Sequence, residues 1–336
     1  MKTKIAADLD LIHASIRNRL NDCSHVLIMS HIRPDGDAIG SLIGFGVALR
    51  TAGKKVTLVS MDGLPSKYRF LEGSELIVRK IEPGYDLFIA VDCADSRRMG
   101  VSLKNLKNLD IDINIDHHIT NENFAELNLV MPEVPATAGI LAEYLPEWGL
   151  PMEKAVANAL LMGIVTDTIG FRTSNVTPHV LRISAQLMEA GANLTDVYNR
   201  TLTSQSYPAS MLWGFALSRL QRENGIIWTV ITLEDREKAG YTDRDDADLT
   251  NLLSAIEGCE ISVLFNEQKD DKVKVSWRSC SQVDVSGIAK YFGGGGHPPA
   301  SGADMDGSLD EVREKVLIKT KKAIKEFYSK GVPKNE

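Results

Sequence analysis

Apolar residues in the first half of the chain form short runs that alternate with helix-like segments. Residues 1–22 place isoleucine and leucine at intervals of three and four, which is the spacing of an amphipathic helix. Short strands are predicted at four places: His25–Met29, Lys55–Ser60, Tyr85–Val91 and 110–115. Helices are predicted over 38–52, 137–149, 152–165 and 178–190. Because strands that alternate with helices are typical of parallel sheets, this half is predicted to be an α/β domain.

The second half has a different pattern. Strands are predicted at 226–231, 260–265 and 273–278, the last two as a hairpin, and helices at 247–257, 288–292 and 308–328. We therefore expect two α/β domains that face each other across a cleft. The N-terminal domain, residues 1–190, would contain a mainly parallel sheet flanked by helices. A linker over 191–212 would join it to a smaller domain over 213–336.

Composition narrows the class of protein. No apolar run among the 336 residues approaches the length that a bilayer requires, and the N-terminus has no apolar stretch of the signal-peptide kind. The four cysteines lack CxxC spacing, which indicates free thiols in the cytoplasm. A net charge of −7 argues against a duplex-DNA binder, because such binding depends on neutralising many phosphates. A small phosphorylated substrate is compatible with this charge.

Ionisable residues collect directly after three of the predicted strands. In chain order they are His31, Asp35 and Asp37, then Asp92, then Asp116, His117 and His118. Since the carboxyl ends of parallel strands meet at one edge of a sheet, where open α/β sheets bind ligands, we expect these residues to lie together. Asp167, at the end of a predicted helix, would need a partner if it were buried. Each aspartate taken alone could instead be a turn, cap or surface residue.

The combination of histidines and aspartates at this sheet edge indicates a metal site. Two histidines and four aspartates exceed the needs of one ion and suit a pair about 3.5–4 Å apart. The candidate ligands are His31, Asp35, Asp37, Asp92, His117 and Asp167. Asp92, alone at its strand end, is the expected bridge. Mixed imidazole and carboxylate ligands favour Mn²⁺, with Co²⁺, Fe²⁺ or Mg²⁺ as substitutes. No cysteine or GxSxG serine lies in these motifs, so the expected nucleophile is a hydroxide activated by the two metals.

The chain resembles the DHH phosphoesterase family in four motifs, which are His31-x-x-x-Asp35-x-Asp37, Asp92, Asp116-His117-His118 and Thr166-Asp167-Thr168. The stretch from Gly293 to Gly302, together with Arg278, resembles the DHH-associated C-terminal domain. The resemblance covers about residues 20 to 320. The organisation without further modules is similar to the bifunctional oligoribonuclease and pAp phosphatase subgroup, where pAp is 3′-phosphoadenosine 5′-phosphate.

This resemblance implies roles for the individual residues. One metal would take His31, Asp35 and Asp92, and the other would take Asp37, Asp92, His117 and Asp167. The catalytic residues would be Asp92, His118 and Asp116. Asp92 would bridge the metals, His118 would contact the scissile phosphate, and Asp116 would orient its neighbours. Arg278 and His297 would bind the phosphate end of the substrate.

The glycine run that precedes His297 is a further candidate for substrate binding. Gly294, Gly295 and Gly296 lack side chains, so their backbone amides could approach a nucleotide closely. A merely flexible loop is the alternative for glycines alone. Two positions depart from the family pattern: Pro298-Pro299 stiffens this copy of the loop, and Ile169 stands where many relatives have glycine. Either could alter substrate preference.

The expected activity is metal-dependent hydrolysis of short nucleotides, on very short RNA, on pAp, or on both. Linear or cyclic dinucleotides are the nearest alternative substrates. Inorganic pyrophosphatases share the N-terminal motifs but have a different second domain. A nucleotide-binding regulator with an inactive metal site is an alternative of another class. The expected partners are short RNA or small nucleotides, without duplex DNA or membrane, and a homodimer is compatible with the sequence.

Overall fold

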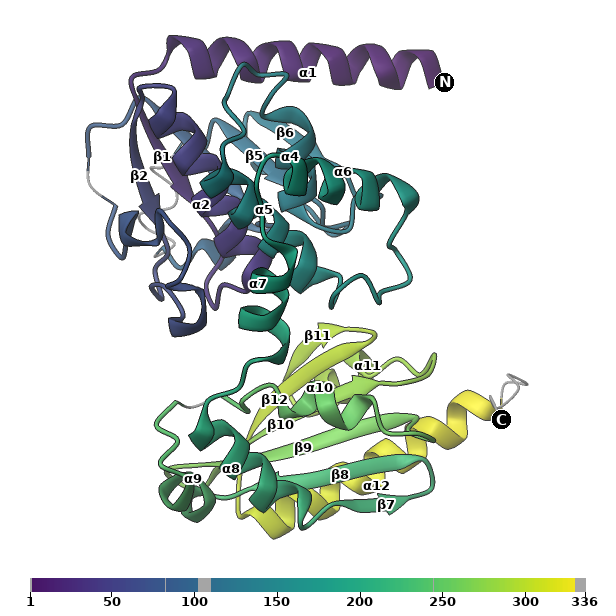
Figure 1. Ribbon diagram of the computed structural model, residues 1–336. Coiled ribbons are helices and arrows are strands. Elements are labelled where there is room, and N and C mark those ends of the chain that lie inside the picture. The colour runs from purple at the N-terminus through teal and green to yellow at the C-terminus, as the bar shows by residue number, and fades with distance from the viewer. Residues whose placement is uncertain (1, 82, 102–109, 244, 330–336) are drawn as a thin grey trace. The chain divides into compact units, whose positions relative to one another are not determined.

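The chain folds into two compact units, Met1–Ser204 and Gln205–Glu336 (Figure 1). The structure is a computed structural model and describes residues 2–81, 83–101, 110–243 and 245–329. Each unit has its own sheet and its own hydrophobic core, so each is described by itself.

The N-terminal unit is built on a six-stranded sheet in the order β3-β2-β1-β4-β5-β6. Its strands are β1 (His25–Met29), β2 (Lys55–Val59), β3 (Ile77–Val78), β4 (Leu87–Val91), β5 (Ile113–Asp116) and β6 (Leu127–Val130). Every neighbouring pair is parallel. The strand order reverses direction between β1 and β4, and this is the switch point at which open α/β sheets bind ligands, outside the carboxyl ends of the strands.

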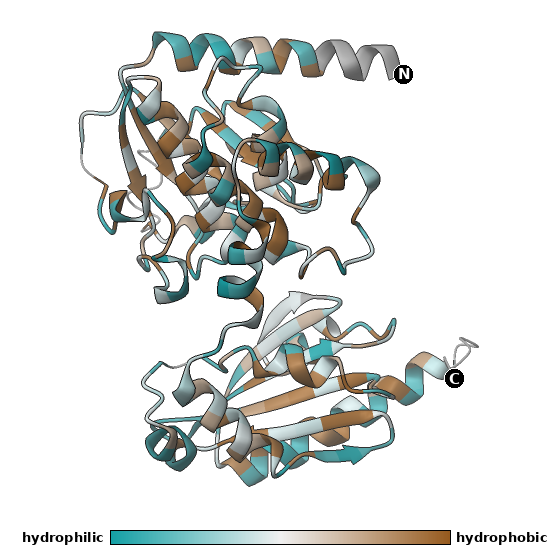
Figure 2. Ribbon diagram, viewed as in Figure 1, coloured by the Kyte–Doolittle hydropathy of each residue, from teal (hydrophilic) through white to brown (hydrophobic). Residues whose placement is uncertain are grey.

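Helices provide the rest of the N-terminal core. They are α1 (Lys2–Asp22), α2 (Gly36–Thr51), α4 (Thr137–Tyr144), α5 (Lys154–Asp167), α6 (Pro178–Glu189) and α7 (Leu194–Tyr198), with a π-helical turn at Asn199–Thr203. Figure 2 shows hydrophobic residues concentrated on the strands and on α2 and α5. A smaller apolar cluster contains other side chains of β1, β2 and β4, such as Met29 and Phe88, together with residues outside the strands, such as Ile111.

Close contact between α2 and α5 depends on glycine. A Cβ on Gly40 of α2 would lie 2.5 Å from the carbonyl oxygen of Ala159, and a Cβ on Gly163 of α5 would lie 2.5 Å from the Cβ of Ala138 in α4. The added Cβ on Gly163 would also lie 2.8 Å from Oδ1 of Asp37. Glycine at these points therefore lets the helices that carry Asp37 and Asp167 approach each other.

The C-terminal unit contains a mixed six-stranded sheet in the order β11-β12-β10-β9-β8-β7. Its strands are β7 (Gln221–Glu223), β8 (Ile226–Ile231), β9 (Ile261–Gln268), β10 (Lys272–Ser279), β11 (Gly295–His297) and β12 (Ala300–Asp306). Only the pair β8 and β9 is parallel among the described strands of this sheet.

Helices form two separate apolar cores with this second sheet. The helices α11 (Ser286–Tyr291) and α12 (Leu309–Tyr328) contribute to one core, and α8 (Tyr207–Leu217), α9 (Leu233–Ala239) and α10 (Leu249–Ser254) contribute to the other. Side chains of β10 alternate between buried and more exposed positions, whereas β9 is buried on both faces, with Phe265 in one core and Leu264 in the other. In β10, Val275 and Trp277 are buried in the core formed with α12, whereas Lys274 is exposed.

The predicted fold class is confirmed, with differences in detail. Of the segments that the hydrophobic pattern did not predict, β6 extends the first sheet, and β11 and β12 form where a loop was expected. The connection between the two units is also shorter than the interval 191–212. Val197 belongs to the main core of the N-terminal unit, and Ala209 belongs to the core that α8, α9 and α10 form in the C-terminal unit. No helix in the described ranges is both long and apolar enough to cross a membrane.

Candidate metal centre

The turn after β1 supplies the first group of site residues. Asp35 is the N-cap of α2, and its Oδ1 accepts hydrogen bonds from the N–H groups of Asp37 and Ala38 at 3.1 and 3.0 Å. This use of Oδ1 leaves Oδ2 directed toward His31, 3.9 Å from its Nε2. The other ring nitrogen of His31, Nδ1, is 2.8 Å from the carbonyl oxygen of Ile32, which fixes the ring so that Nε2 faces the carboxylates.

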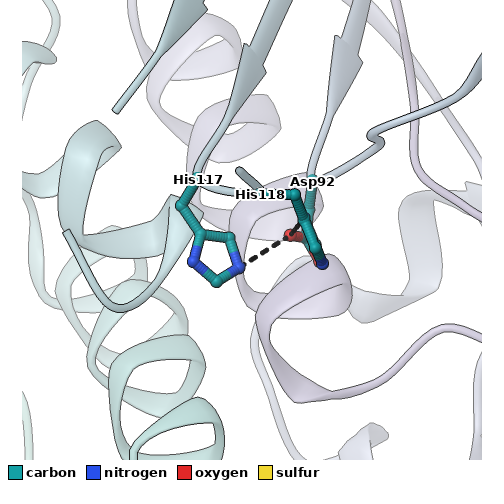
Figure 3. A group of neighbouring side chains, drawn as sticks. All are labelled: Asp92, His117 and His118. Carbon is teal, nitrogen blue, oxygen red and sulfur yellow. Dashed lines mark ion pairs between the residues drawn. The ribbon is translucent and has the colours of Figure 1, made fainter. Parts of the chain in front are cut away.

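Asp92 lies at the centre of the cluster. It directly follows β4, its side chain is 1% exposed, and its backbone has the left-handed φ of 54°. Oδ2 lies 3.4 Å from Nε2 of His31, whereas Oδ1 lies 3.6 Å from Nε2 of His117. Figure 3 shows the ring of His117 directed at this carboxylate, with the contact drawn as a dashed line. The two oxygens of Asp92 thus face different histidines.

A second group of side chains surrounds His117. Its Nε2 lies 3.9 Å from Oδ2 of Asp37 and 3.8 Å from Oδ2 of Asp167. Asp37 comes from the first turn of α2, and Asp167 is the last residue of α5. The ligand atoms form three groups of close neighbours: His31 with Asp35 and Asp92, His117 with Asp37 and Asp167, and Asp92 with His117 and His118. Asp92 therefore lies near both of the predicted ligand sets.

His118 is held in a different way from His117. Its Nδ1 is 2.7 Å from Oδ1 of the buried Asp116, and Nδ2 of Asn121 donates to the other oxygen of Asp116 at 2.6 Å. Burial alone would lower the pKa of His118, but the carboxylates of Asp116 and Asp92 outweigh it and raise this pKa to about 9. The ring is therefore oriented and kept cationic near neutral pH.

The carboxylates of the cluster repel one another. Burial, together with the charges of Asp92 and Asp35, raises the pKa of Asp167 to about 8. Burial and the same neighbours, with Asp167, hold the pKa of Asp37 well above its usual value. Asp92 is the exception: despite burial, the hydrogen bond from His31 and the nearby imidazoles lower its pKa. Ionisation of all these carboxyl groups together is therefore unfavourable unless positive charge is placed beside them.

The residues present fit a pair of divalent cations. Two ligand atoms at 2.0–2.2 Å from one ion lie roughly 3.0–3.4 Å apart. The nitrogen-to-oxygen distances of 3.4 to 3.9 Å around His31 and His117 are slightly longer than this. Small side-chain movements would bring these atoms to coordination distance of two ions, with Asp92 between them.

The hydrophobic pattern did not single out three residues that hold this cluster together. Thr137 and Ala138, at the start of α4, donate backbone hydrogen bonds to the carboxylate of Asp37. Asn121 supports Asp116, as described above. The predicted start of a helix at 137 was a usable signal for the first two, because the N–H groups of a first turn seek acceptors. Nothing in the sequence pattern indicates the contact of Asn121.

The substrate-binding candidates lie in the C-terminal unit. Arg278 is in β10 and half-buried; burial lowers its pKa, and Asp246 and Asp248 are its charged neighbours. The glycine run is not a loop, since Gly295–His297 form β11 and pair with β12. Arg278 and His297 are both paired with Ala300, one from each side. The side chain of His297 lies outside the described part of the structure.

Comparison with known proteins identifies the family. Residues 25–164 match the model described as the DHH family, N-terminal domain, and residues 219–329 match the DHHA1 domain. The chain is 38% identical to the bifunctional oligoribonuclease and PAP phosphatase NrnA of Thermus thermophilus over 87% of this chain and 88% of that protein. The chain belongs to the DHH family.

Two further proteins extend the comparison. The NrnA protein of Bacillus subtilis, with the same described activities, is 28% identical over 83% of this chain and 89% of its own length. A crystal structure of an exopolyphosphatase-related protein from Bacteroides fragilis has a TM-score of 0.86, with 23% identity and coverage of 95% and 96% of the two chains, and so shares the fold. The DHH match contains all the candidate ligands except Asp167, which lies three residues beyond its end.

Proposed function

We propose that this protein is a two-metal phosphoesterase that hydrolyses very short RNA and 3′-phosphoadenosine 5′-phosphate in the cytoplasm. The observation that carries the proposal is the placement of Asp92, whose two oxygens face two separate sets of imidazole and carboxylate ligands. The likeness to NrnA proteins over most of the chain supports these two substrates. Because the ligands mix nitrogen and oxygen, Mn²⁺ is the proposed ion, with Co²⁺, Fe²⁺ or Mg²⁺ as substitutes.

In this proposal the residues of the N-terminal unit divide into ligands and phosphate contacts. His31, Asp35 and Asp92 hold one ion, and Asp37, Asp92, His117 and Asp167 hold the other. When bound, the two ions activate water and offset the charge that develops on the phosphate. The imidazolium of His118, oriented by Asp116, binds the scissile phosphate and stabilises its additional negative charge in the transition state.

The C-terminal unit is proposed to hold the substrate by its terminal nucleotide. The guanidinium of Arg278 matches the geometry of a phosphate and can donate two parallel hydrogen bonds to it. His297 and the backbone amides of Gly295 and Gly296 would contact the same nucleotide. The N–H of Gly294 is not available for this role, because it donates to the carbonyl oxygen of Ala289 at 2.9 Å. The same residues could serve both substrates, since a mononucleotide bisphosphate resembles the end of a short RNA.

Dinucleotide hydrolysis is the second candidate function. The cyclic-di-AMP phosphodiesterase GdpP of Geobacillus thermodenitrificans is 25% identical over 99% of this chain, although the match spans only 52% of that protein. Its similarity is weaker than that of the NrnA proteins. Linear and cyclic dinucleotides therefore belong in the same experiment.

The test is a parallel assay of the full-length protein with MnCl₂. Its substrates are pAp, RNA of two to five nucleotides, RNA of about 24 nucleotides, linear and cyclic di-AMP, and pyrophosphate. We expect high kcat/KM for pAp and for the shortest RNA, and loss of both activities in EDTA with recovery on adding Mn²⁺. Preference for a cyclic dinucleotide or for pyrophosphate would contradict the proposed substrates. Turnover that persists in EDTA would contradict the metal mechanism.

A further inference from the structure

Two carboxylates of the metal centre are bound by the first residues of α4, a helix that carries none of the candidate ligands. The preceding residue, Ala136, is extended and provides no side-chain cap. The N–H of Thr137 donates instead to Oδ2 of Asp37 at 2.6 Å, and the N–H of Ala138 donates to Oδ1 of Asp37 at 2.8 Å. Because the first N–H groups of a helix have no intrahelical acceptor, the carboxylate of Asp37 takes the place of the missing cap.

The side chain of Thr137 makes a second contact with the centre. Its Oγ1 donates to Oδ1 of Asp92 at 3.1 Å, and the residue is fully buried. Oδ1 faces Nε2 of His117 at 3.6 Å and Nδ1 of His118 at 3.7 Å, whereas the opposite oxygen faces His31. A single residue of α4 therefore contacts one carboxylate through its backbone and another through its hydroxyl.

The direction of this hydroxyl differs from that of Thr168 and Thr201, the other buried threonines in the described part of the N-terminal unit. Threonine in a helix commonly bonds to the carbonyl four residues earlier. Thr168 and Thr201 do so, with distances of 2.6 and 2.7 Å to the carbonyl oxygens of Ile164 and Val197. Thr137 is the first residue of its helix, so that acceptor is missing and the hydroxyl turns to Asp92.

We propose that Thr137 is a positioning residue that fixes the rotation of the Asp92 carboxylate, so that each oxygen serves a different metal ion. This inference rests on the two-metal site of the proposed function. The terminal torsion of an aspartate is soft, and rotation would otherwise let both oxygens turn toward one ion. A hydrogen bond to Oδ1 removes this freedom while leaving that oxygen a further lone pair for the ion near His117.

The proposal predicts an unequal loss of metal affinity. In Thr137→Val the hydroxyl is removed while the shape and the backbone N–H remain, so Asp37 keeps its bonds and Asp92 loses one. We expect the wild-type protein to bind two Mn²⁺ ions. In the variant, the affinity of the ion that depends on Oδ1 of Asp92 falls about 10- to 100-fold, which is the usual cost of losing a partner of a metal ligand. The affinity of the other ion changes less.

The experiment is calorimetric titration of metal-stripped, full-length protein with MnCl₂, together with thermal unfolding in EDTA. Thr137→Ser restores the hydroxyl and should restore both affinities. Thr201→Val is the matched control, because it removes a buried threonine hydroxyl in the same unit that does not contact the centre. It should bind both ions as the wild type does. If Thr137→Val does not fold, Thr137→Ala compared with Thr137→Ser makes the same test.

The outcomes separate this inference from the proposed function. Two wild-type sites with an unchanged Thr137→Val titration would overturn only the role of Thr137. The role of Thr137 would also be overturned if Thr137→Val weakened Mn²⁺ binding equally at both sites and unfolded in EDTA at a lower temperature than Thr201→Val. The hydroxyl would then serve stability alone. A wild-type protein that binds no Mn²⁺ would instead overturn the manganese site on which both proposals rest.

Discussion

The two units place their candidate functional residues in different ways. In the N-terminal unit these residues follow the carboxyl ends of β1, β4 and β5, on either side of the switch point between β1 and β4. In the C-terminal unit they lie within strands, with Arg278 inside β10 and the glycines in or beside β11. Parallel strands end at a common edge, so strand order alone gathers residues that are distant in sequence. Antiparallel neighbours end at opposite edges, so register must do this, as it does at Ala300.

The largest effect is expected from the residue that joins the two ligand sets. Asp92→Asn removes the bridging charge, and we expect kcat/KM to fall by about a thousandfold or more, since metal stabilisation of the transition state contributes several kcal/mol. Asparagine has nearly the same shape and tolerates the φ of 54°, so the fold should be kept. Kinetics on pAp and short RNA measure this effect. Asp306→Asn, at the exposed end of β12, is the control and should be fully active. A loss of less than tenfold in Asp92→Asn would exclude a bridging role.

A smaller and different effect is expected in the C-terminal unit. Arg278→Ala removes charge-assisted hydrogen bonds worth about 1.5–3 kcal/mol, so KM should rise roughly 10- to 100-fold while bound Mn²⁺ stays constant. Lys274→Ala is the control for the loss of a positive charge, because Lys274 lies four residues before Arg278 on the same strand and therefore on the same face of the sheet. Steady-state kinetics and metal analysis distinguish the two units. Metal loss in Arg278→Ala would mean that the division into metal-binding and substrate-binding units is wrong.

The glycines of β11 allow a finer test. A Cβ on Gly296, at φ 139°, would lie 2.5 Å from the carbonyl oxygen of Ala300, whereas a Cβ on Gly295 would meet no atom within 4 Å. Gly296→Ala should therefore cost about 1–3 kcal/mol of stability through clash and strain. Gly295→Ala should unfold at the wild-type temperature but have a KM several times higher, because its methyl group would obstruct a nucleotide that approaches the amide. An unchanged KM in Gly295→Ala would contradict nucleotide binding by the glycine run, whose glycines would then serve the structure alone.

The smallest effect compares one helix cap from each unit. Ser308 caps α12 in a capping box, and Ser308→Ala should cost about 1 kcal/mol of stability without changing Mn²⁺ affinity. Asp35 caps α2 but is also a candidate ligand. Because asparagine is an equally good cap, Asp35→Asn should keep the unfolding temperature in EDTA and weaken Mn²⁺ binding. Thermal unfolding and calorimetry measure both. Unchanged Mn²⁺ affinity in Asp35→Asn would mean that Asp35 caps α2 and is not a metal ligand.

The sequence was most informative where side-chain pattern and chain direction determine the structure. The predicted strand His25–Met29 coincides with β1, and the expected meeting of His31, Asp92 and His117 at one sheet edge is observed. The strand in the glycine run was not predictable from pattern, because glycine has no side chain whose alternation could reveal the pairing with β12. The contacts of Thr137 and Asn121 depend on tertiary packing, and the local hydrophobic pattern carries no information about it.

Gly163 is a position at which the usual exchange of a helical glycine for alanine would not make this protein more heat-resistant. Glycine inside a helix costs about 1 kcal/mol of stability relative to alanine, so exchange for alanine is a standard way to stabilise helices. In α5 that exchange would push a methyl group against Ala138 and Asp37. Stabilising exchanges will therefore have to be sought at other positions, because the small size of Gly163 leaves room for Asp37, a candidate metal ligand.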